Sequence, residues 1–117
     1  MKESNVVQEK SESFAVRICK LHDYLVEQKK ERTISNQILR SGCSIGANIA
    51  EAIYAESTDD FIHKLKIARK ECSETGYWLR ILHRSEKISE AEYESLRTDN
   101  DTLLKLLTKI IKSSVSN

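Results

Sequence analysis

The chain has 117 residues, no proline and only three glycines, so it is long enough for one compact domain and contains few residues that break helices. Nineteen Lys and Arg residues nearly balance eighteen Asp and Glu residues, for a formal net charge of +1. This balance excludes a strongly basic protein that attracts nucleic acid or anionic lipid over long range. We therefore expect an all-α protein with residues 1–117 in a single domain, on which any nucleic-acid surface is a local patch.

Apolar periodicity predicts four helices, over residues 5–30, 33–56, 58–84 and 89–113. The core face of the first helix consists of Val7, Phe14, Ile18, Leu21 and Leu25. The core face of the second consists of Ile34, Ile38, Ile45, Ile49 and Ala52. Thr33 or Ser35 is the predicted N-cap of the second helix, because a hydroxyl at this position can accept a hydrogen bond from a free backbone amide.

The third and fourth helices have the clearest start signals. Ser57, followed three residues later by Asp60, predicts a capping box for the third helix, and Ser89 with Glu92 predicts one for the fourth. The core stripe of the third helix alternates by four and three residues through Phe61, Leu65, Ala68, Cys72, Thr75, Leu79 and Leu82. That of the fourth contains Leu96, Leu103, Leu107 and Ile110, widened by Leu104, Leu106 and Ile111. Short links between these helices predict an antiparallel up-down-up-down four-helix bundle.

Small residues recur on one flank of the second helix, at Gly42, Gly46 and Ala50. A glycine inside a helix costs about 1 kcal/mol relative to alanine, so we expect these positions to admit the close approach of a neighbouring helix. A phosphate-binding loop needs a strand before its glycines, and no strand is predicted here.

The three cysteines, Cys19, Cys43 and Cys72, all fall within predicted helices. An odd number of helical cysteines favours reduced thiols and a cytoplasmic location over a secreted disulfide framework. No apolar run is long enough to span a membrane, and the first ten residues lack the apolar region of a signal peptide. We therefore predict no membrane association.

Polar residues near the core stripes of the second and third helices are the main candidates for chemistry: Ser44, Asn48, Glu71 and Glu74. Buried polar groups need partners, which favours a structural hydrogen-bonded network that sets the register of the two helices. The alternative is a carboxylate metal site, but such sites use Glu-x-x-His on two helices, and only Asp60 and His63 approach that spacing. No catalytic motif is present, so we predict no catalytic residue, bound metal or cofactor.

The third helix carries two further features on its outward side. Ile67, Trp78 and Ile81 lie beside its core stripe, with Tyr77 adjacent, so its apolar arc is wider than one bundle seam requires. Either this helix is the most central one, or the flank is a self-association surface. Its basic residues also share one side, with uncharged residues between them: Lys66, Arg69, Arg80 and Arg84. This stripe is either an ordinary solvated face or a surface for phosphates, which Arg40 would extend.

The segments RSGCSIGANIAEA (residues 40–52) and FIHKLKIARKECSETGYWLRIL (residues 61–82) resemble the central part of bacterial 23S rRNA intervening-sequence proteins, also described as four helix bundle proteins. SFAVRICKLHDYL (residues 13–25) fits the same family. The resemblance implies a four-helix bundle that forms a homo-oligomeric ring, commonly a pentamer, with Tyr77 and Trp78 as interface anchors. It also extends to the accessory variability protein of diversity-generating retroelements, a basic ring associated with a reverse transcriptase and its RNA. The near-neutral charge of this chain departs from that relative.

These observations favour a non-catalytic, cytoplasmic, homo-oligomeric bundle that acts as an RNA-associated scaffold. One alternative is an adaptor that binds an unidentified protein through the Trp78 flank and does not bind nucleic acid. Another is a small metal-dependent enzyme that uses Glu71 and Glu74.

Overall fold

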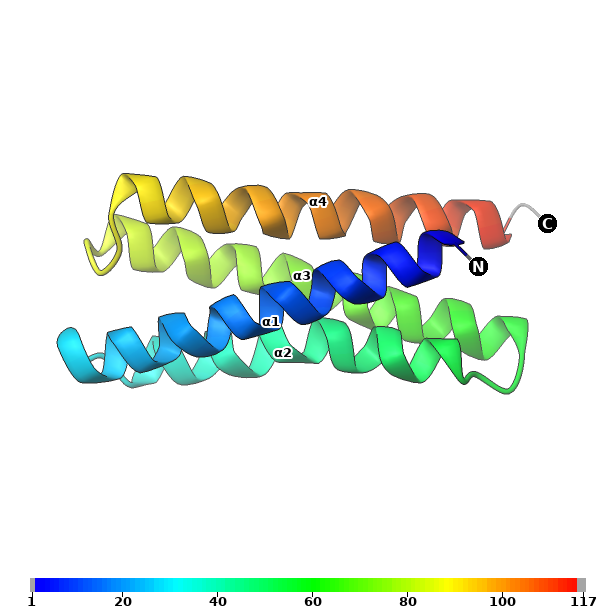
Figure 1. Ribbon diagram of the computed structural model, residues 1–117, viewed down its shortest axis with the longest axis horizontal. Helices are drawn as coiled ribbons and strands as arrows, with labels where there is room; N and C mark the ends of the chain where they lie inside the picture. The colour runs from blue at the N-terminus through cyan, green and yellow to red at the C-terminus, as the bar shows by residue number, and fades with distance from the viewer. Residues whose placement is uncertain (1, 116–117) are drawn as a thin grey trace.

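Four antiparallel helices make up the part of the chain that the structure describes. The computed structural model covers residues 2–115, with helices α1 (Lys2–Gln28), α2 (Thr33–Ile53), α3 (Thr58–Arg84) and α4 (Glu90–Val115). Figure 1 shows that the start of α1, the α2–α3 link and the end of α4 lie at one end of the bundle. The predicted all-α, up-down-up-down four-helix bundle is confirmed.

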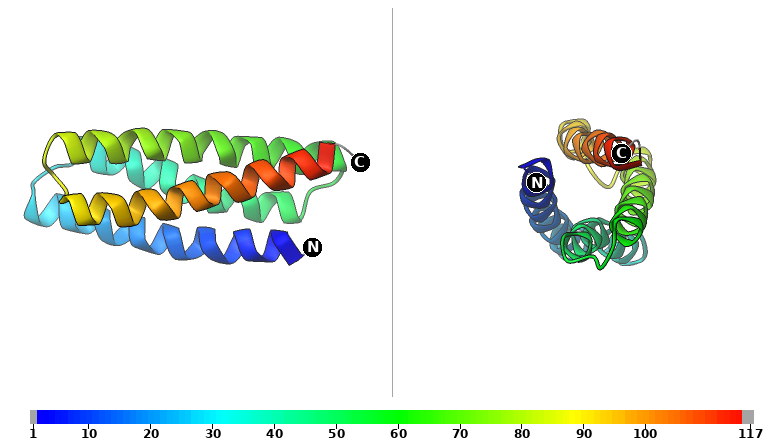
Figure 2. Two further views of the ribbon diagram at one scale, coloured as in Figure 1. Left: turned by 90° about the horizontal axis from the view of Figure 1, so that it is seen from above. Right: turned by 90° about the vertical axis from the view of Figure 1, so that its right-hand side faces the viewer.

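The helices form an elongated body of 47 × 21 × 19 Å in which each helix packs on the next and α1 returns to α4. The α2–α3 pair packs most extensively and the α1–α4 pair least. The end-on view in Figure 2 shows α1 and α4 well apart at the end nearest the viewer. Arg17 bridges this looser pair, because its guanidinium donates to the Asp99 carboxylate at 2.6 Å and to the Ser95 hydroxyl at 2.9 Å.

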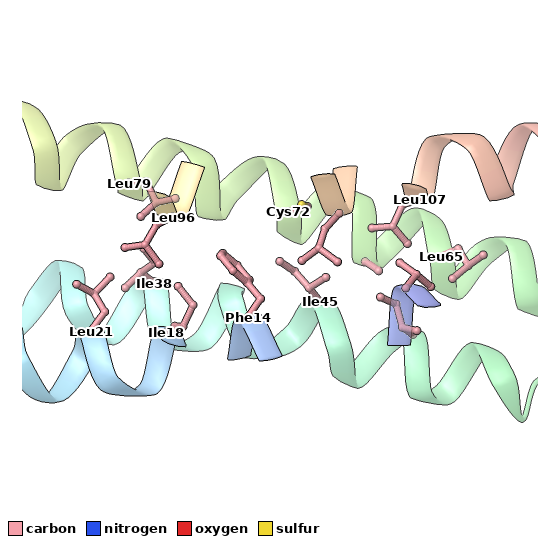
Figure 3. Close-up of a cluster of buried hydrophobic side chains, with 14 of the residues drawn as sticks. Phe14, Ile18, Leu21, Ile38, Ile45, Leu65, Cys72, Leu79, Leu96 and Leu107 are labelled. Carbon is pink, nitrogen blue, oxygen red and sulfur yellow. The ribbon is translucent and has the colours of Figure 1, made fainter. Parts of the chain in front are cut away.

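The core lies along the bundle axis and consists largely of the predicted stripes. Figure 3 shows side chains from all four helices in one cluster, among them Phe14, Ile45, Cys72 and Leu107. Ile34 and Phe61 were predicted in the core but are only half-buried at its edge, as are Leu104 and Leu106. Each fully buried Leu, Ile or Phe contributes about 1.5–3 kcal/mol relative to exposure, so this cluster is the main source of stability.

The helix starts agree with prediction in α3 and α4 but not in α2. The Asp60 amide donates to the Ser57 hydroxyl at 3.0 Å. The Ser89 amide donates to the Glu92 carboxylate at 2.9 Å, and the Glu92 amide donates to the Ser89 hydroxyl at 3.1 Å. At α2 the prediction of Thr33 or Ser35 as the cap is wrong. The carboxylate of Glu31 accepts from the amides of Ile34 and Ser35, at 3.0 and 2.7 Å.

Two helices end before their predicted limits. α1 ends at Gln28 rather than residue 30, because Lys30 adopts a φ of 56° and the Glu31 amide then closes onto the Leu25 carbonyl at 3.0 Å. α2 ends at Ile53 rather than residue 56, where the amides of Tyr54 and Ala55 bond three residues back instead of four.

The small residues of α2 allow α1 to approach closely, as predicted. A Cβ atom on Gly42 would lie 2.9 Å from Cγ1 of Ile18, and one on Gly46 would lie 3.2 Å from the Ser11 hydroxyl. Both glycines therefore have a packing role at the α1–α2 contact. None of the helices described here is long and apolar enough to cross a membrane.

Candidate functional site

The predicted basic stripe lies on the outward side of α3. Because Leu65, Ala68, Cys72, Leu79 and other members of the core stripe are buried, the opposite side of the same helix faces solvent. Lys66, Arg80 and Arg84 are exposed there, and Arg69 is half-buried. The packing of α3 against α2 and α4 therefore brings these four cations to one side of the bundle.

Most of these cations are available to an external anion. Among the described residues, no ion pair forms on Lys66, Arg69 or Arg84. The guanidinium carbon of Arg80 lies 5.9 Å from the centre of the Tyr77 ring, a cation–π arrangement that leaves its N–H groups free to donate. This surface can bind phosphate oxygens without first breaking a salt bridge.

Arg40 differs from the other four predicted RNA contacts. It joins α2 to α3, donating to the Glu71 carboxylate at 2.7 Å and to the Glu74 carboxylate at 2.6 Å. The hydrogen bonds to Glu71 and then Glu74 hold the pKa of Arg40 above its usual range. Two carboxylates thus hold the Arg40 guanidinium, and Arg40 links α2 to α3 instead of extending the stripe.

Glu74 also receives a hydrogen bond from Trp78. The indole N–H donates to the second Glu74 oxygen at 2.9 Å. This bond, followed by the bonds from Arg40, lowers the pKa of the Glu74 carboxyl. Glu71 and Glu74 are therefore used as acceptors by Arg40 and Trp78, and no group of three or more His, Cys, Asp or Glu side chains in the described part of the chain is placed to hold a metal ion.

The predicted polar network is only partly brought together. Ser44 donates to the Arg40 carbonyl at 2.7 Å and Asn48 donates to the Ser44 carbonyl at 2.8 Å, so both side chains bond within α2 and not to Glu71 or Glu74.

The buried polar contacts between helices lie at neighbouring positions. Thr75 donates to the Ser41 hydroxyl at 2.9 Å. Asn100 donates to the Cys72 carbonyl at 3.0 Å, while the Cys72 thiol is 3.2 Å from the Asn100 side-chain oxygen. Ser41 and Asn100 were identifiable in the sequence, because each falls at core spacing within its helix.

A largely apolar surface, interrupted by the Arg40–Glu74 pair, lies on the other outward flank of α3 and continues onto α2. Ile67, Trp78 and Ile81 are half-buried, and Tyr77 is 46% exposed. The rings of Tyr77 and Trp78 meet edge-on, with their centroids 4.9 Å apart. The Arg40–Glu74 and Lys64–Glu51 pairs set the antiparallel register, which places the exposed Ala47 of α2 at the same level along the bundle as Ile67. We call Ala47, Ile67, Tyr77, Trp78 and Ile81 the α2–α3 face.

The contribution of α2 to this face was missed at the level of sequence, although a signal was present. Arg40 and Glu51 are the only charged residues among the 21 of α2, whereas a helix with one solvent-facing side normally carries more.

Comparison with known proteins identifies a matching family and a similar solved structure. A family model described as 23S rRNA-intervening sequence protein matches residues 3–109. The chain is also similar to a protein with unknown function from the S23 ribosomal protein family of Bacteroides thetaiotaomicron VPI-5482, whose crystal structure was determined at 1.70 Å resolution. The two share 55% sequence identity with a TM-score of 0.93, over 94% of this chain and 98% of that one. No curated protein matches the chain significantly.

Proposed function

Because the chain belongs to the 23S rRNA-intervening sequence protein family, we propose that it is a non-catalytic, RNA-associated scaffold of the cytoplasm, assembled from several copies of this bundle. The similar Bacteroides protein is described as having unknown function, so the proposal depends on the surfaces of this chain. The observation that carries it is the set of outward cations on α3 that form no salt bridge with any residue that the structure describes: Lys66, Arg69 and Arg84, with Arg80 over Tyr77.

Phosphate contact explains this arrangement without requiring a basic protein. Cations that bind a nucleic-acid backbone release its condensed counterions, so a few local contacts contribute to affinity even when the net charge is near zero. The formal charge of +1 for the whole chain therefore does not oppose a local RNA surface. Specific bases need not be read for such binding, because phosphates position a protein without specifying sequence.

Self-association of the α2–α3 face complements this role. A second copy covering Ile67, Trp78 and Ile81 would remove apolar surface from water, and a closed ring, a pentamer by family resemblance, would repeat the cations of α3 around its circumference. Repetition raises the avidity of weak contacts for a long polyanion. The edge-on pair of Tyr77 and Trp78 supplies the aromatic surface that is common at interface centres.

A labelled, structured ribosomal RNA fragment tests the RNA part of the proposal. Fluorescence anisotropy over a salt series should show binding by the wild-type protein that weakens as salt rises. Arg69→Glu combined with Arg80→Glu should abolish binding but leave the oligomeric mass unchanged. Lys10→Glu with Lys20→Glu is the matched control, because it makes the same change in charge at exposed positions of α1. Absence of wild-type binding at low salt, or equal losses in both variants, would show that α3 is not the RNA surface.

Light scattering tests the assembly. The wild-type protein should have the mass of a closed oligomer, and Trp78→Ala should reduce that mass while circular dichroism reports unchanged helicity. A monomeric wild-type protein that also fails to bind RNA would favour the protein-binding adaptor. The enzyme alternative has less support, because Glu71 and Glu74 already bind Arg40.

A further inference from the structure

The charges of α4 are separated along its length. All of its acidic residues lie in the first half: Glu90, Glu92, Glu94, Asp99 and Asp101. From Thr102 to Val115 there is no acidic residue, and three exposed lysines follow one another there: Lys105, Lys109 and Lys112. α4 thus has an acidic half and a basic half, a division that the net charge of the chain conceals.

One segment of α3, residues 61–70, resembles the basic half of α4 in composition. Residues 61–70 contain no acidic residue and include His63, Lys64, Lys66, Arg69 and Lys70. Lys64 is held by Glu51 of α2 at 3.0 Å, whereas the structure shows no ion pair on Lys66, Arg69 or Lys70 within residues 4–115. Asp59 and Asp60 lie in the first turn of α3, and Asp60 accepts a hydrogen bond from the Glu56 amide.

The register of α3 and α4 brings these two basic segments together. Cys72 bonds to Asn100, and the His83 imidazole lies 2.6 Å from the Glu90 carboxylate. Since the helices are antiparallel, each step toward the start of α3 is a step toward the end of α4 (Figure 1). Lys66 and Arg69 therefore lie beside residues 102–108, and Arg80 and Arg84 lie beside the acidic residues 90–94.

We infer that the RNA backbone binds at one end of the bundle, on a basic end formed by Lys66, Arg69 and Lys70 of α3 with Lys105, Lys109 and Lys112 of α4, and not along the whole of α3. This inference rests on the proposed function and locates its site. It also adds α4, which the stripe on α3 does not include, to the RNA surface.

The two halves of the α3 stripe are far enough apart to act separately. Lys66 and Arg80 are about 21 Å apart along the helix axis, at ~1.5 Å per residue. Salt screens exposed charges over roughly 8 Å at physiological ionic strength, so each half responds mainly to its own neighbours. Near Arg80 and Arg84 those neighbours include Glu90 and Glu92, which repel a phosphate backbone, and Glu94, whose charge is paired with Arg97 at 2.7 Å. At the basic end the neighbouring segment of α4 carries lysines alone among its charged residues.

The surface at the basic end is also suited to an extended ligand. A shallow open depression of about 410 Å³ follows α4, lined by Leu104, Lys105, Thr108, Lys109 and Lys112. Lysine stems can pack along such a surface while their ammonium groups stay in water, and the exposed Thr108 hydroxyl adds a group able to donate to a phosphate oxygen.

Two variants with the same change in charge separate the two halves. Lys66→Glu with Lys105→Glu alters the basic end, and Arg80→Glu with Arg84→Glu alters the other half of the stripe; all four side chains are exposed. Both are compared with the wild type in the anisotropy assay over a salt series, using the same ribosomal RNA fragment. Circular dichroism and light scattering confirm that fold and mass are unchanged.

We expect the basic-end variant to bind at least about tenfold more weakly. The slope of log affinity against log salt concentration should become shallower by about two units, one for each phosphate contact removed. The Arg80 and Arg84 variant should lose less affinity and less of the salt slope than the basic-end variant, because the acidic residues of α4 beside it already offset part of its attraction for phosphate. Equal losses in the two variants, or a larger loss in the Arg80 and Arg84 variant, would overturn the basic end as the site while leaving RNA binding intact. Absence of binding by the wild type would overturn the proposed function and this inference together.

Discussion

The three thiols of the chain lie in different environments. Cys19 is exposed, Cys43 is half-buried and Cys72 is fully buried. Burial, with a smaller effect of Asp101, raises the pKa of the Cys72 thiol to about 12. Burial and then the neighbouring Cys19 raise the pKa of Cys43 to about 11. Only the thiolate is an effective nucleophile, so both shifts reduce reactivity near neutral pH.

We therefore expect iodoacetamide to alkylate Cys19 first, Cys43 more slowly, and Cys72 only when the protein is unfolded in urea. Peptide mass spectrometry of samples quenched over time at mildly alkaline pH measures the three rates separately. Alkylation of Cys72 in the native protein as fast as that of Cys19 would contradict the buried hydrogen bond between Cys72 and Asn100.

Gly42 offers a second prediction at the scale of single residues. A Cβ atom there would lie 2.9 Å from the side chain of Ile18, which is fully buried and cannot move aside freely. Overpacking costs about 1–3 kcal/mol, against a gain of about 1 kcal/mol from the helix propensity of alanine. We expect Gly42→Ala to lower the free energy of unfolding in urea by up to about 2 kcal/mol, the difference between these effects.

The same substitution in an Ile18→Ala background is the control. Alanine at position 18 removes the two nearest atoms, Cγ1 and Cγ2, and leaves only its Cβ at 3.3 Å, so Gly42→Ala should then cost less stability or raise it. A loss of equal size in both backgrounds would mean that the α1–α2 contact is not the cause.

Residue patterns in the sequence predicted the apolar core better than its polar members. Apolar periodicity identified Ile18, Ile45 and Leu79 because such side chains have one favourable location. Ser41 and Asn100 occupy the same stripes, but their partners, Thr75 and Cys72, are on other helices. Which polar side chain meets which depends on interhelical register, and one helix alone does not contain that information.

At the scale of helices, the start of α2 shows where local patterns fail. Ser89 and Glu92 were recognisable because both partners lie within one turn and fit a known motif. Glu31 lies before α2 and reaches forward to the amides of Ile34 and Ser35, an arrangement that a search for a hydroxyl cap overlooks. The left-handed backbone at Lys30 makes this turn possible.

Glu31→Ala should therefore destabilise the protein by about 1 kcal/mol, the usual effect of removing a helix cap. Thr33→Ala is the control, since the described structure gives the Thr33 hydroxyl no hydrogen bond and the side chain is exposed. Urea titration followed by circular dichroism measures both variants. If Thr33→Ala were the more damaging substitution, Thr33 and not Glu31 would be the residue that caps α2.

At the scale of the whole molecule, the distribution of charge matters more than its sum. A formal charge of +1 is compatible with an acidic first half of α4 and a basic second half. The sequence shows both halves, but only the antiparallel pairing of α4 with α3 shows that the basic half lies beside Lys66 and Arg69. The basic stripe on α3 lies within one helix, so the sequence alone could predict it. Its pairing with the basic half of α4 depends on packing between helices, which the sequence of either helix does not show.

Assembly through the α2–α3 face leads to a prediction that does not disturb the core. Ala47 is exposed in the single chain, at the same level along the bundle as Ile67, so Ala47→Glu should leave helicity and urea unfolding of the monomer almost unchanged. In an assembled protein the new carboxylate would be buried without a partner, which costs several kcal/mol, and light scattering should report a smaller mass. Ala91→Glu, at an exposed position of α4, is the control and should keep the wild-type mass. If Ala47→Glu also kept that mass, copies of the chain would have to meet through another face, and the α2–α3 face would be left for a different protein partner.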